Sequence, residues 1–134
     1  MIKLIVGKKG FGKTKILVDM INTSAKKSSG NIVCIEKEQK LTYDIDHSVR
    51  LVDVENYAIT GADTFYGTLA GLLAGNYDIT EIYVDSILKV IGNDLDELGK
   101  LLDKVDKLAG ESVLVVFTVS ADLSELPESV KKYV

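Results

Sequence analysis

The sequence is poor in the residues that build disulfides and metal centres. Its 134 residues include one cysteine, one proline, one histidine and no tryptophan. Cys34 has no partner for a disulfide within the chain, and neither Cys34 nor His47 has the neighbouring cysteines or histidines of a zinc site. These absences exclude a disulfide framework and a cysteine or histidine metal centre within this chain. We expect Cys34 to be a buried structural thiol in a reducing, cytoplasmic setting.

The sequence also lacks a long apolar run. No stretch approaches the roughly 20 apolar residues that cross a bilayer. The apolar start is too short for a secretory signal, because Lys8 and Lys9 follow it at once. We therefore expect a cytoplasmic protein without membrane insertion. With 46% hydrophobic residues, the chain suits one domain that spans residues 1–134.

Charge is unevenly distributed along the chain. The formal net charge is −4, yet residues 1–40 carry nine lysines and three acidic residues, a net of +6, whereas the remainder carries a net of −10. A positive region attracts polyanions by long-range electrostatics. The basic part therefore favours a phosphate-bearing ligand. Nucleic acid is one such partner, and a solvated basic face is the alternative.

The most specific motif lies at the start of the chain. The apolar residues Leu4, Ile5 and Val6 lead into residues 7–14, which satisfy the pattern G-x-x-x-x-G-K-[ST]. Glycines let the backbone approach a ligand closely, so that its amides point at phosphate oxygens, and the start of a helix adds positive charge. We expect nucleotide phosphates to contact Gly7, Lys8, Lys9, Gly10, Phe11, Gly12, Lys13, Thr14 and Lys15.

This motif resembles Walker A of the P-loop NTPases. The resemblance implies a bound nucleoside triphosphate, most often ATP, together with Mg²⁺. It assigns Lys13 to the β and γ phosphates, where it serves catalysis, and the Thr14 hydroxyl to the metal. It also implies a three-layer α/β sandwich with a mostly parallel five-stranded sheet of P-loop NTPase topology.

The second anchor is the stretch 81–86, which reads EIYVDS. An aspartate that closes an apolar strand resembles Walker B, whose carboxylate holds Mg²⁺ opposite the Walker A hydroxyl. Asp85 and Thr14 are therefore the expected metal ligands. Ser86 stands where many ATPases of this class carry glutamate, and this departure leaves the catalytic base open.

Two carboxylates are candidates for that base. Glu36 and Glu38 follow the apolar run 32–35, which predicts a strand buried on both faces. The carboxyl ends of parallel strands line up beside a phosphate loop, where a carboxylate can orient water. The placement is similar to that of the catalytic glutamate of RecA-like ATPases. The alternative is a solvated turn over residues 36–40.

The last predicted strand, residues 112–119, has the valine and phenylalanine content of a central strand. In P-loop ATPases of the additional-strand class, such a strand lies between the Walker A and Walker B strands, and a polar residue at its tip contacts the γ-phosphate. Thr118 or Ser120 matches that role. The tail from residue 120 onward looks similar to the corresponding segment of FtsK, HerA and zonular-occludens-toxin-like motor ATPases.

Hydrophobic periodicity supplies the remaining elements. It predicts helices over residues 13–26, 63–74 and 93–110, a strand over residues 49–54, an optional edge strand at residues 41–43 and a short helix after Pro127. Asp63 is the expected N-cap of the second helix, and Asn93 or Asp94 that of the third. Glycines at 67, 71 and 75 predict a close contact of the second helix with the sheet or a second subunit. Pairs at i, i+4 are expected between Asp96 and Lys100 and between Asp103 and Lys107.

The leading hypothesis is an Mg·ATP-binding ATPase module that works as a homo-oligomer or with a protein partner. A nucleotide-gated interaction module with negligible hydrolysis is the first alternative, suggested by Ser86. A small-molecule or nucleoside kinase is the second. Such kinases usually carry an arginine-bearing lid, and Arg50 is the only arginine in the sequence. It starts a predicted strand, at the end of a parallel sheet away from the phosphates.

Overall fold

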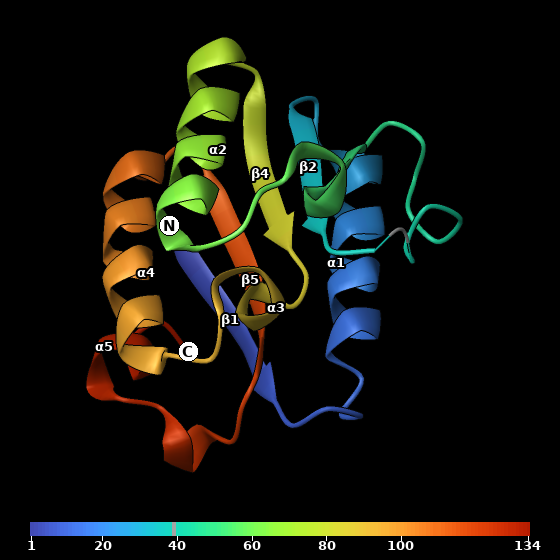
Figure 1. Ribbon diagram of the computed structural model, residues 1–134. Helices are drawn as coiled ribbons and strands as arrows, with labels where there is room; N and C mark the ends of the chain where they lie inside the picture. The colour runs from blue at the N-terminus through green and yellow to red at the C-terminus, as the bar shows by residue number, and fades with distance from the viewer. Residues whose placement is uncertain (39) are drawn as a thin grey trace.

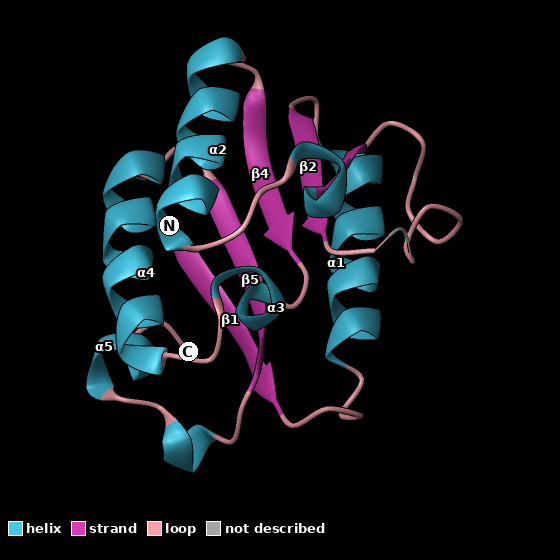
Figure 2. Ribbon diagram, viewed as in Figure 1, coloured by secondary structure: helices cyan, strands magenta, loops and turns pink. Residues whose placement is uncertain are grey.

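The computed structural model describes residues 1–38 and 40–134, which form an α/β fold around a parallel sheet (Figures 1 and 2). The sheet has the order β1-β5-β4-β2-β3, and all neighbouring strands run parallel. Its strands are β1 (Ile2–Gly7), β2 (Asn31–Glu36), β3 (Arg50–Asp53), β4 (Ile79–Val84) and β5 (Leu114–Ser120). The helices are α1 (Lys13–Lys27), α2 (Ala62–Gly75), α3 (Ile87–Ile91), α4 (Leu95–Ala109) and α5 (Glu128–Lys131), with 3₁₀ turns η1 (Val54–Tyr57) and η2 (Leu123–Glu125).

Helices cover both faces of the sheet, which makes three layers. On one face, α1 packs Leu17 and Ile21 against β2 and β4, next to the buried Cys34. On the other face, α2 and α4 pack side chains such as Phe65 and Leu102 against the central strands. Figure 1 shows α1 on one side of the sheet and α2 and α4 on the other. Burial from both sides is the reason why β2, β4 and β5 have nearly continuous apolar sequences.

The strand order positions the site. The inserted strand β5 pairs with both β1 and β4, as the additional-strand resemblance implied. This register sets Gly7 beside Ser120, and Val84 beside Phe117. The carboxyl ends of β1, β5 and β4 therefore lie side by side at one end of the sheet. Arg50 pairs with Val33 near the start of its strand, at the opposite end of the sheet, as the sequence predicted.

Several local predictions are wrong. Asp63 does not cap α2, because Gly61 is the N-cap residue, with φ of +86° and an amide that donates to Val90 O. Residues 41–43 form a bend and turn rather than an edge strand, since Leu41 is buried against α1 and β2 instead of pairing. The sequence also gave no signal for α3, whose five residues are too few for a helical period.

The glycines of α2 do not make the predicted close contact with the sheet, and the alternative of a contact with a second subunit stays a prediction. A methyl group added at Gly67, Gly71 or Gly75 would meet no atom within 4 Å. The expected i, i+4 partner of Asp103 is also wrong, because this carboxylate accepts a hydrogen bond from the Tyr133 hydroxyl at 2.5 Å and pairs with Lys132 Nζ at 3.0 Å. The chain end beyond α5 therefore anchors on α4. Across residues 1–38 and 40–134, the helices are too short or too polar to cross a membrane.

Candidate functional site

The loop between β1 and α1 has the backbone that its glycines predict. Gly10 has φ of +95° and Gly12, the N-cap of α1, has φ of +76°, values that side-chain-bearing residues rarely adopt. Gly7 serves a different purpose, because a methyl group there would lie 3.0 Å from Cδ2 of Phe11. The Phe11 ring thus lies over the end of β1 and is itself 71% exposed.

Lys13 is the buried cation of this loop. Its side chain is 8% exposed, and its Nζ donates a hydrogen bond to the carbonyl oxygen of Lys8 at 2.9 Å. Burial lowers the pKa of the Lys13 ammonium, and the negative charge of Asp85 acts in the opposite direction. An ammonium that is partly removed from water binds an entering anion more strongly than a fully exposed one does.

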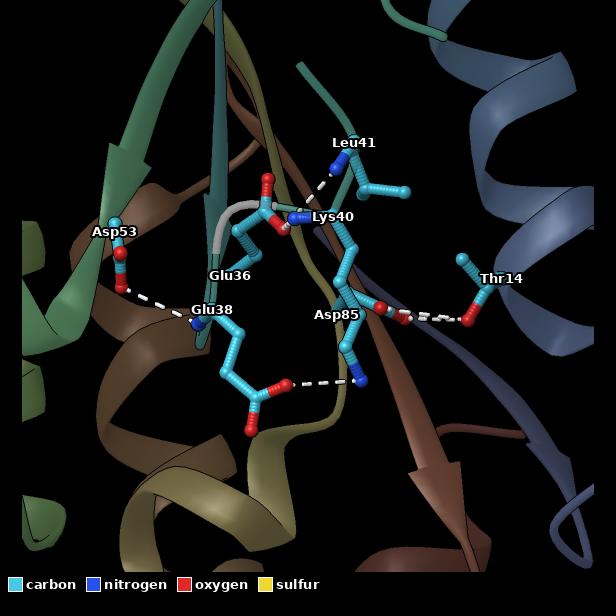
Figure 3. A network of polar contacts seen from close by, with 7 residues as sticks. All are labelled: Thr14, Glu36, Glu38, Lys40, Leu41, Asp53 and Asp85. Atoms are coloured by element: carbon cyan, nitrogen blue, oxygen red, sulfur yellow. Dashed lines mark hydrogen bonds and ion pairs between the residues drawn. The ribbon is translucent and has the colours of Figure 1, made fainter. Parts of the chain in front are cut away.

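Thr14 and Asp85 are brought together from positions 71 residues apart. The Thr14 hydroxyl, in the first turn of α1, lies 3.2 Å from Asp85 Oδ1 and 3.3 Å from Oδ2, just beyond the end of β4. Figure 3 shows the two side chains pointing toward one another. Hydroxyl and carboxylate oxygens are hard ligands that suit Mg²⁺.

The composition of the site also fits Mg²⁺ better than a metal bound by protein alone. Among residues 1–38 and 40–134, no group of three or more His, Cys, Asp and Glu side chains could hold a metal ion. Mg²⁺ commonly takes one or two protein oxygens and completes its shell with water and substrate phosphates. The Thr14 and Asp85 oxygens meet that requirement.

The two candidate residues of β5 differ in their contacts. The buried Thr118 hydroxyl donates to Asp85 Oδ1 at 2.8 Å and accepts a hydrogen bond from the Ser86 amide at 2.6 Å. Its single O–H donor is therefore used within the protein. Ser120, by contrast, is exposed and lines the cleft described below. The geometry favours Ser120 for contact with a ligand and Thr118 for orienting Asp85.

A cleft of about 680 Å³ opens over these groups. It brings together five of the residues predicted to bind phosphate and the Walker B-like aspartate, along with residues from β5, α3 and the segment after β2. Its lining residues are Lys9, Gly10, Gly12, Lys13, Thr14, Lys37, Lys40, Asp85, Ser86, Leu88, Lys89, Asn93 and Ser120. In the described part of the chain, the lining holds five lysines and a single carboxylate. The cleft is therefore strongly cationic.

Neither candidate base lines this cleft. Glu36 is 2% exposed, and its Oε1 accepts hydrogen bonds from the amides of Lys40 at 2.8 Å and Leu41 at 3.3 Å. Burial raises the pKa of the Glu36 carboxyl, while those two amides oppose the rise. Glu38 is exposed and pairs with Lys40 Nζ at 3.0 Å. This ion pair lowers the pKa of Glu38.

Four residues of the predicted phosphate-binding set also lie outside the lining, namely Gly7, Lys8, Phe11 and Lys15. The Lys8 ammonium pairs with Asp122 Oδ2 at 3.4 Å, so the loop is tied to the segment after β5. Lys15 is exposed on α1. Of the loop residues before Lys13, only Lys9, Gly10 and Gly12 line the cleft.

Sequence reasoning missed three lysines of the lining. Lys37 lies between Glu36 and Glu38, and Lys40 follows them, so the sequence indicated these two lysines only as part of a solvated turn. Lys89 lies on α3, the helix that the sequence did not indicate. The excess of lysine over acidic residues in the first forty positions was the available signal.

Comparison with known proteins supports the fold. No protein-family model matches the chain, and no curated protein matches it. Among solved structures, the chain is similar to flagellar accessory protein FlaH from Methanocaldococcus jannaschii, with a TM-score of 0.66 and 15% sequence identity. The similarity covers 98% of this chain and 65% of that chain, so the present sequence spans about two thirds of the FlaH length. At this identity the likeness concerns the fold, an α/β architecture around a parallel five-stranded sheet.

Proposed function

We propose that the chain belongs to the P-loop NTPases and binds a nucleoside triphosphate, ATP in the first instance, as its Mg²⁺ complex. The carrying observation is the contact between Thr14 and Asp85 at 3.2 Å, beside a buried Lys13 and a loop with two glycines at positive φ. A glycine turn that merely joined a strand to a helix would need neither the carboxylate nor the buried ammonium. The whole sequence, residues 1–134, forms the nucleotide-binding domain in this proposal.

Different residues bind the phosphates and the metal ion in this proposal. Backbone amides of the loop from Lys9 to Thr14 bind phosphate oxygens, helped by the positive end of α1. The Lys13 ammonium moves from the Lys8 carbonyl to the phosphates. Mg²⁺, held by Thr14 and Asp85, would neutralise charge on the phosphate oxygens when bound. Thr118 keeps the Asp85 carboxylate oriented through its hydrogen bond of 2.8 Å.

Hydrolysis depends on a second component in this proposal. Asp85 is the one carboxylate in the cleft lining among the described residues, and Glu36 is buried away from the cleft, with its Oε1 bound to backbone amides. A second copy of the chain or a partner protein would complete the site, and the module would then act as an ATPase. FlaH, with the same fold, is named an accessory protein. DNA is a further candidate activator, because the first forty residues carry an excess of lysines.

A titration with mant-ATP in the presence of Mg²⁺ tests nucleotide binding. Removal of a desolvated ammonium from a phosphate costs about 2–3 kcal/mol, so we expect Lys13→Ala to weaken binding by about 30-fold or more. Lys100→Ala is the matched control, since Lys100 is exposed on α4 and outside the cleft. Equal affinities of wild type and Lys13→Ala would end the proposal.

The same absence of a second carboxylate supports a second candidate, a nucleotide-dependent switch with negligible turnover. Phosphate release measured with the chain alone, at increasing protein concentration and with DNA separates the two. Turnover that rises with concentration or with DNA favours the ATPase. Tight ATP binding without turnover under all three conditions favours the switch.

A further inference from the structure

Three lysines outside the Walker A-like and Walker B-like segments line the same cleft. Lys37 and Lys40 follow β2, and Lys89 lies on α3. We call these three residues the lysine wall. The phosphate loop and Asp85 lie in the same cleft of about 680 Å³, so one ligand of nucleotide size can reach both the loop and the wall.

Hydrogen bonds hold the segment that carries the wall. Glu36 Oε1 binds the amides of Lys40 and Leu41, and Asp53 Oδ1, at the end of β3, accepts from the Glu38 amide at 3.3 Å. Figure 3 shows these hydrogen bonds of Glu36 and Asp53 as dashed lines. Glu38 has φ of +71°, a backbone that costs energy for a residue with a side chain and persists only where the surroundings impose it. These contacts position the backbone next to Lys37 and at Lys40.

A contact also joins the two segments that carry the lysine wall. The Lys37 ammonium donates to the carbonyl oxygen of Lys89 at 3.5 Å, which links the segment after β2 to α3. Asp85 raises the pKa of Lys40, after the larger effect of Glu38, which indicates that the wall and the Walker B-like carboxylate share one electrostatic environment.

Glu38 is the internal counter-ion of the wall. Its carboxylate pairs with Lys40, and Lys89 and Lys37 also lower its pKa, after the larger effect of Lys40. One exposed carboxylate balances three ammonium groups only in part. A phosphate group carries more charge and three acceptor oxygens, so it would compete with Glu38 for these lysines.

The other cation that could serve a terminal phosphate is out of reach. Arg50, the only arginine in the sequence, begins β3 and pairs with Val33 toward the far end of the sheet. It lines a different pocket, with Gly71 and Leu72 of α2. Within one chain, the positive charge beyond the phosphate loop comes from the lysine wall.

We propose that the lysine wall binds the terminal phosphate of the nucleotide, gives the cleft its preference for triphosphate over diphosphate, and exchanges Glu38 for that phosphate on binding. This inference rests on the proposed function. It assigns the recognition of the γ-phosphate to residues of the chain itself, whereas the loop amides and Lys13 bind the phosphates that ATP and ADP share.

The test compares mant-ATP and mant-ADP affinities of the full chain in Mg²⁺. We expect the double variant Lys37→Ala/Lys89→Ala to bind mant-ATP about tenfold more weakly while mant-ADP affinity stays within about twofold. Glu38→Gln removes the competing charge, and its mant-ATP affinity should rise severalfold without a matching change for mant-ADP. Lys100→Ala is the control for the loss of a lysine elsewhere. Misfolding cannot raise affinity, so the Glu38 variant keeps the test meaningful if the double variant is unstable.

Three outcomes would overturn the inference. Equal losses for both nucleotides would show that the wall acts only as general positive charge. Unchanged nucleotide affinities with a loss of salt-dependent binding to single-stranded DNA would assign the wall to a different polyanion. A wild-type chain that binds neither nucleotide would overturn the proposed function and this inference with it, whereas binding that Lys13→Ala abolishes and the double variant leaves unchanged would overturn this inference alone.

Discussion

The Thr118 hydroxyl is hydrogen-bonded to Asp85 Oδ1 at 2.8 Å and to the Ser86 amide at 2.6 Å. This one side chain thereby joins the carboxyl end of β5 to the turn that follows β4. The turn is itself unusual, because Ser86 has φ of +60°. Asp85 is fixed in place from two sides, by Thr118 within the sheet and by Thr14 at the start of α1.

Replacement of Thr118 by valine tests this role. Valine keeps the shape of the buried side chain but leaves the Ser86 amide without its acceptor, and an unsatisfied buried group costs about 1–3 kcal/mol. We expect Thr118→Val to lower the free energy of unfolding in urea by that amount and to weaken Mg²⁺-dependent mant-ATP binding. Thr118→Ser retains the hydroxyl and should recover the Mg²⁺ dependence. Identical behaviour of wild type and the valine variant would contradict the positioning role.

The Thr14 hydroxyl can be tested through the metal alone. Thr14 is exposed in the cleft, so loss of its hydroxyl should leave the fold intact. We expect Thr14→Val to lose most of the increase in mant-ATP affinity that Mg²⁺ produces, by about tenfold, while affinity in EDTA stays the same. Thr14→Ser is the conservative control. An unchanged response to Mg²⁺ in the valine variant would remove Thr14 from the metal site.

Glu36 predicts a pH dependence of stability. Its pKa is raised above the ordinary 4.5, mainly by burial, while the Lys40 and Leu41 amides oppose the rise and Asp85 and Asp53 add to it. The folded state then holds the proton more tightly than the unfolded state, so this group's contribution to stability falls as pH rises from 4.5 through the raised pKa. Glutamine in place of Glu36 keeps an oxygen acceptor for the two amides and does not titrate.

We therefore expect Glu36→Gln to gain stability relative to wild type as pH rises above 4.5, measured as the difference in unfolding free energy in urea. At the acid end the two proteins should be similar, because the wild-type carboxyl is then protonated. Parallel curves over the whole range would mean that the folded and unfolded states hold the Glu36 proton equally. The variant also tests catalysis, since a water-orienting Glu36 would lose turnover on this change.

Two mid-helix glycines predict opposite effects of one substitution. A methyl group at Gly71 of α2 meets no atom within 4 Å, so Gly71→Ala should raise the free energy of unfolding by up to about 1 kcal/mol through helix propensity. At Gly99 of α4 the methyl group would lie 2.8 Å from Ser129 Cβ, and α5 would have to move. We expect Gly99→Ala to be destabilising by about 1–3 kcal/mol. Thermal unfolding of both variants checks the pair, and a stable Gly99→Ala would show that α5 is not closely packed there.

The sequence alone determined the architecture because its signals are local or periodic. The pattern from Gly7 to Thr14 specifies a strand, a glycine loop and a helix in succession, and the doubly buried runs specify a parallel sheet covered on both faces. The chain position of β5 predicted its place between β1 and β4 through the family resemblance, and the register confirms that place. The boundaries of α1 and α4 followed from periodicity, and Asp94 caps α4 as one of two predicted residues.

The tertiary structure decided which polar groups face the cleft. Glu36 and Lys37 are neighbours in the sequence, yet the glutamate turns inward to the amides of Lys40 and Leu41 while the lysine lines the cleft. Side chains of successive residues at the end of a strand point to opposite faces of the sheet. The helices that pack on each face decide which of these side chains reaches the cleft. Lys89 reaches the cleft from α3 because this short helix is positioned by packing and not by its own periodicity. Sequence thus determined the glycine loop and the sheet, whereas contacts between distant segments determined the charge of the cleft.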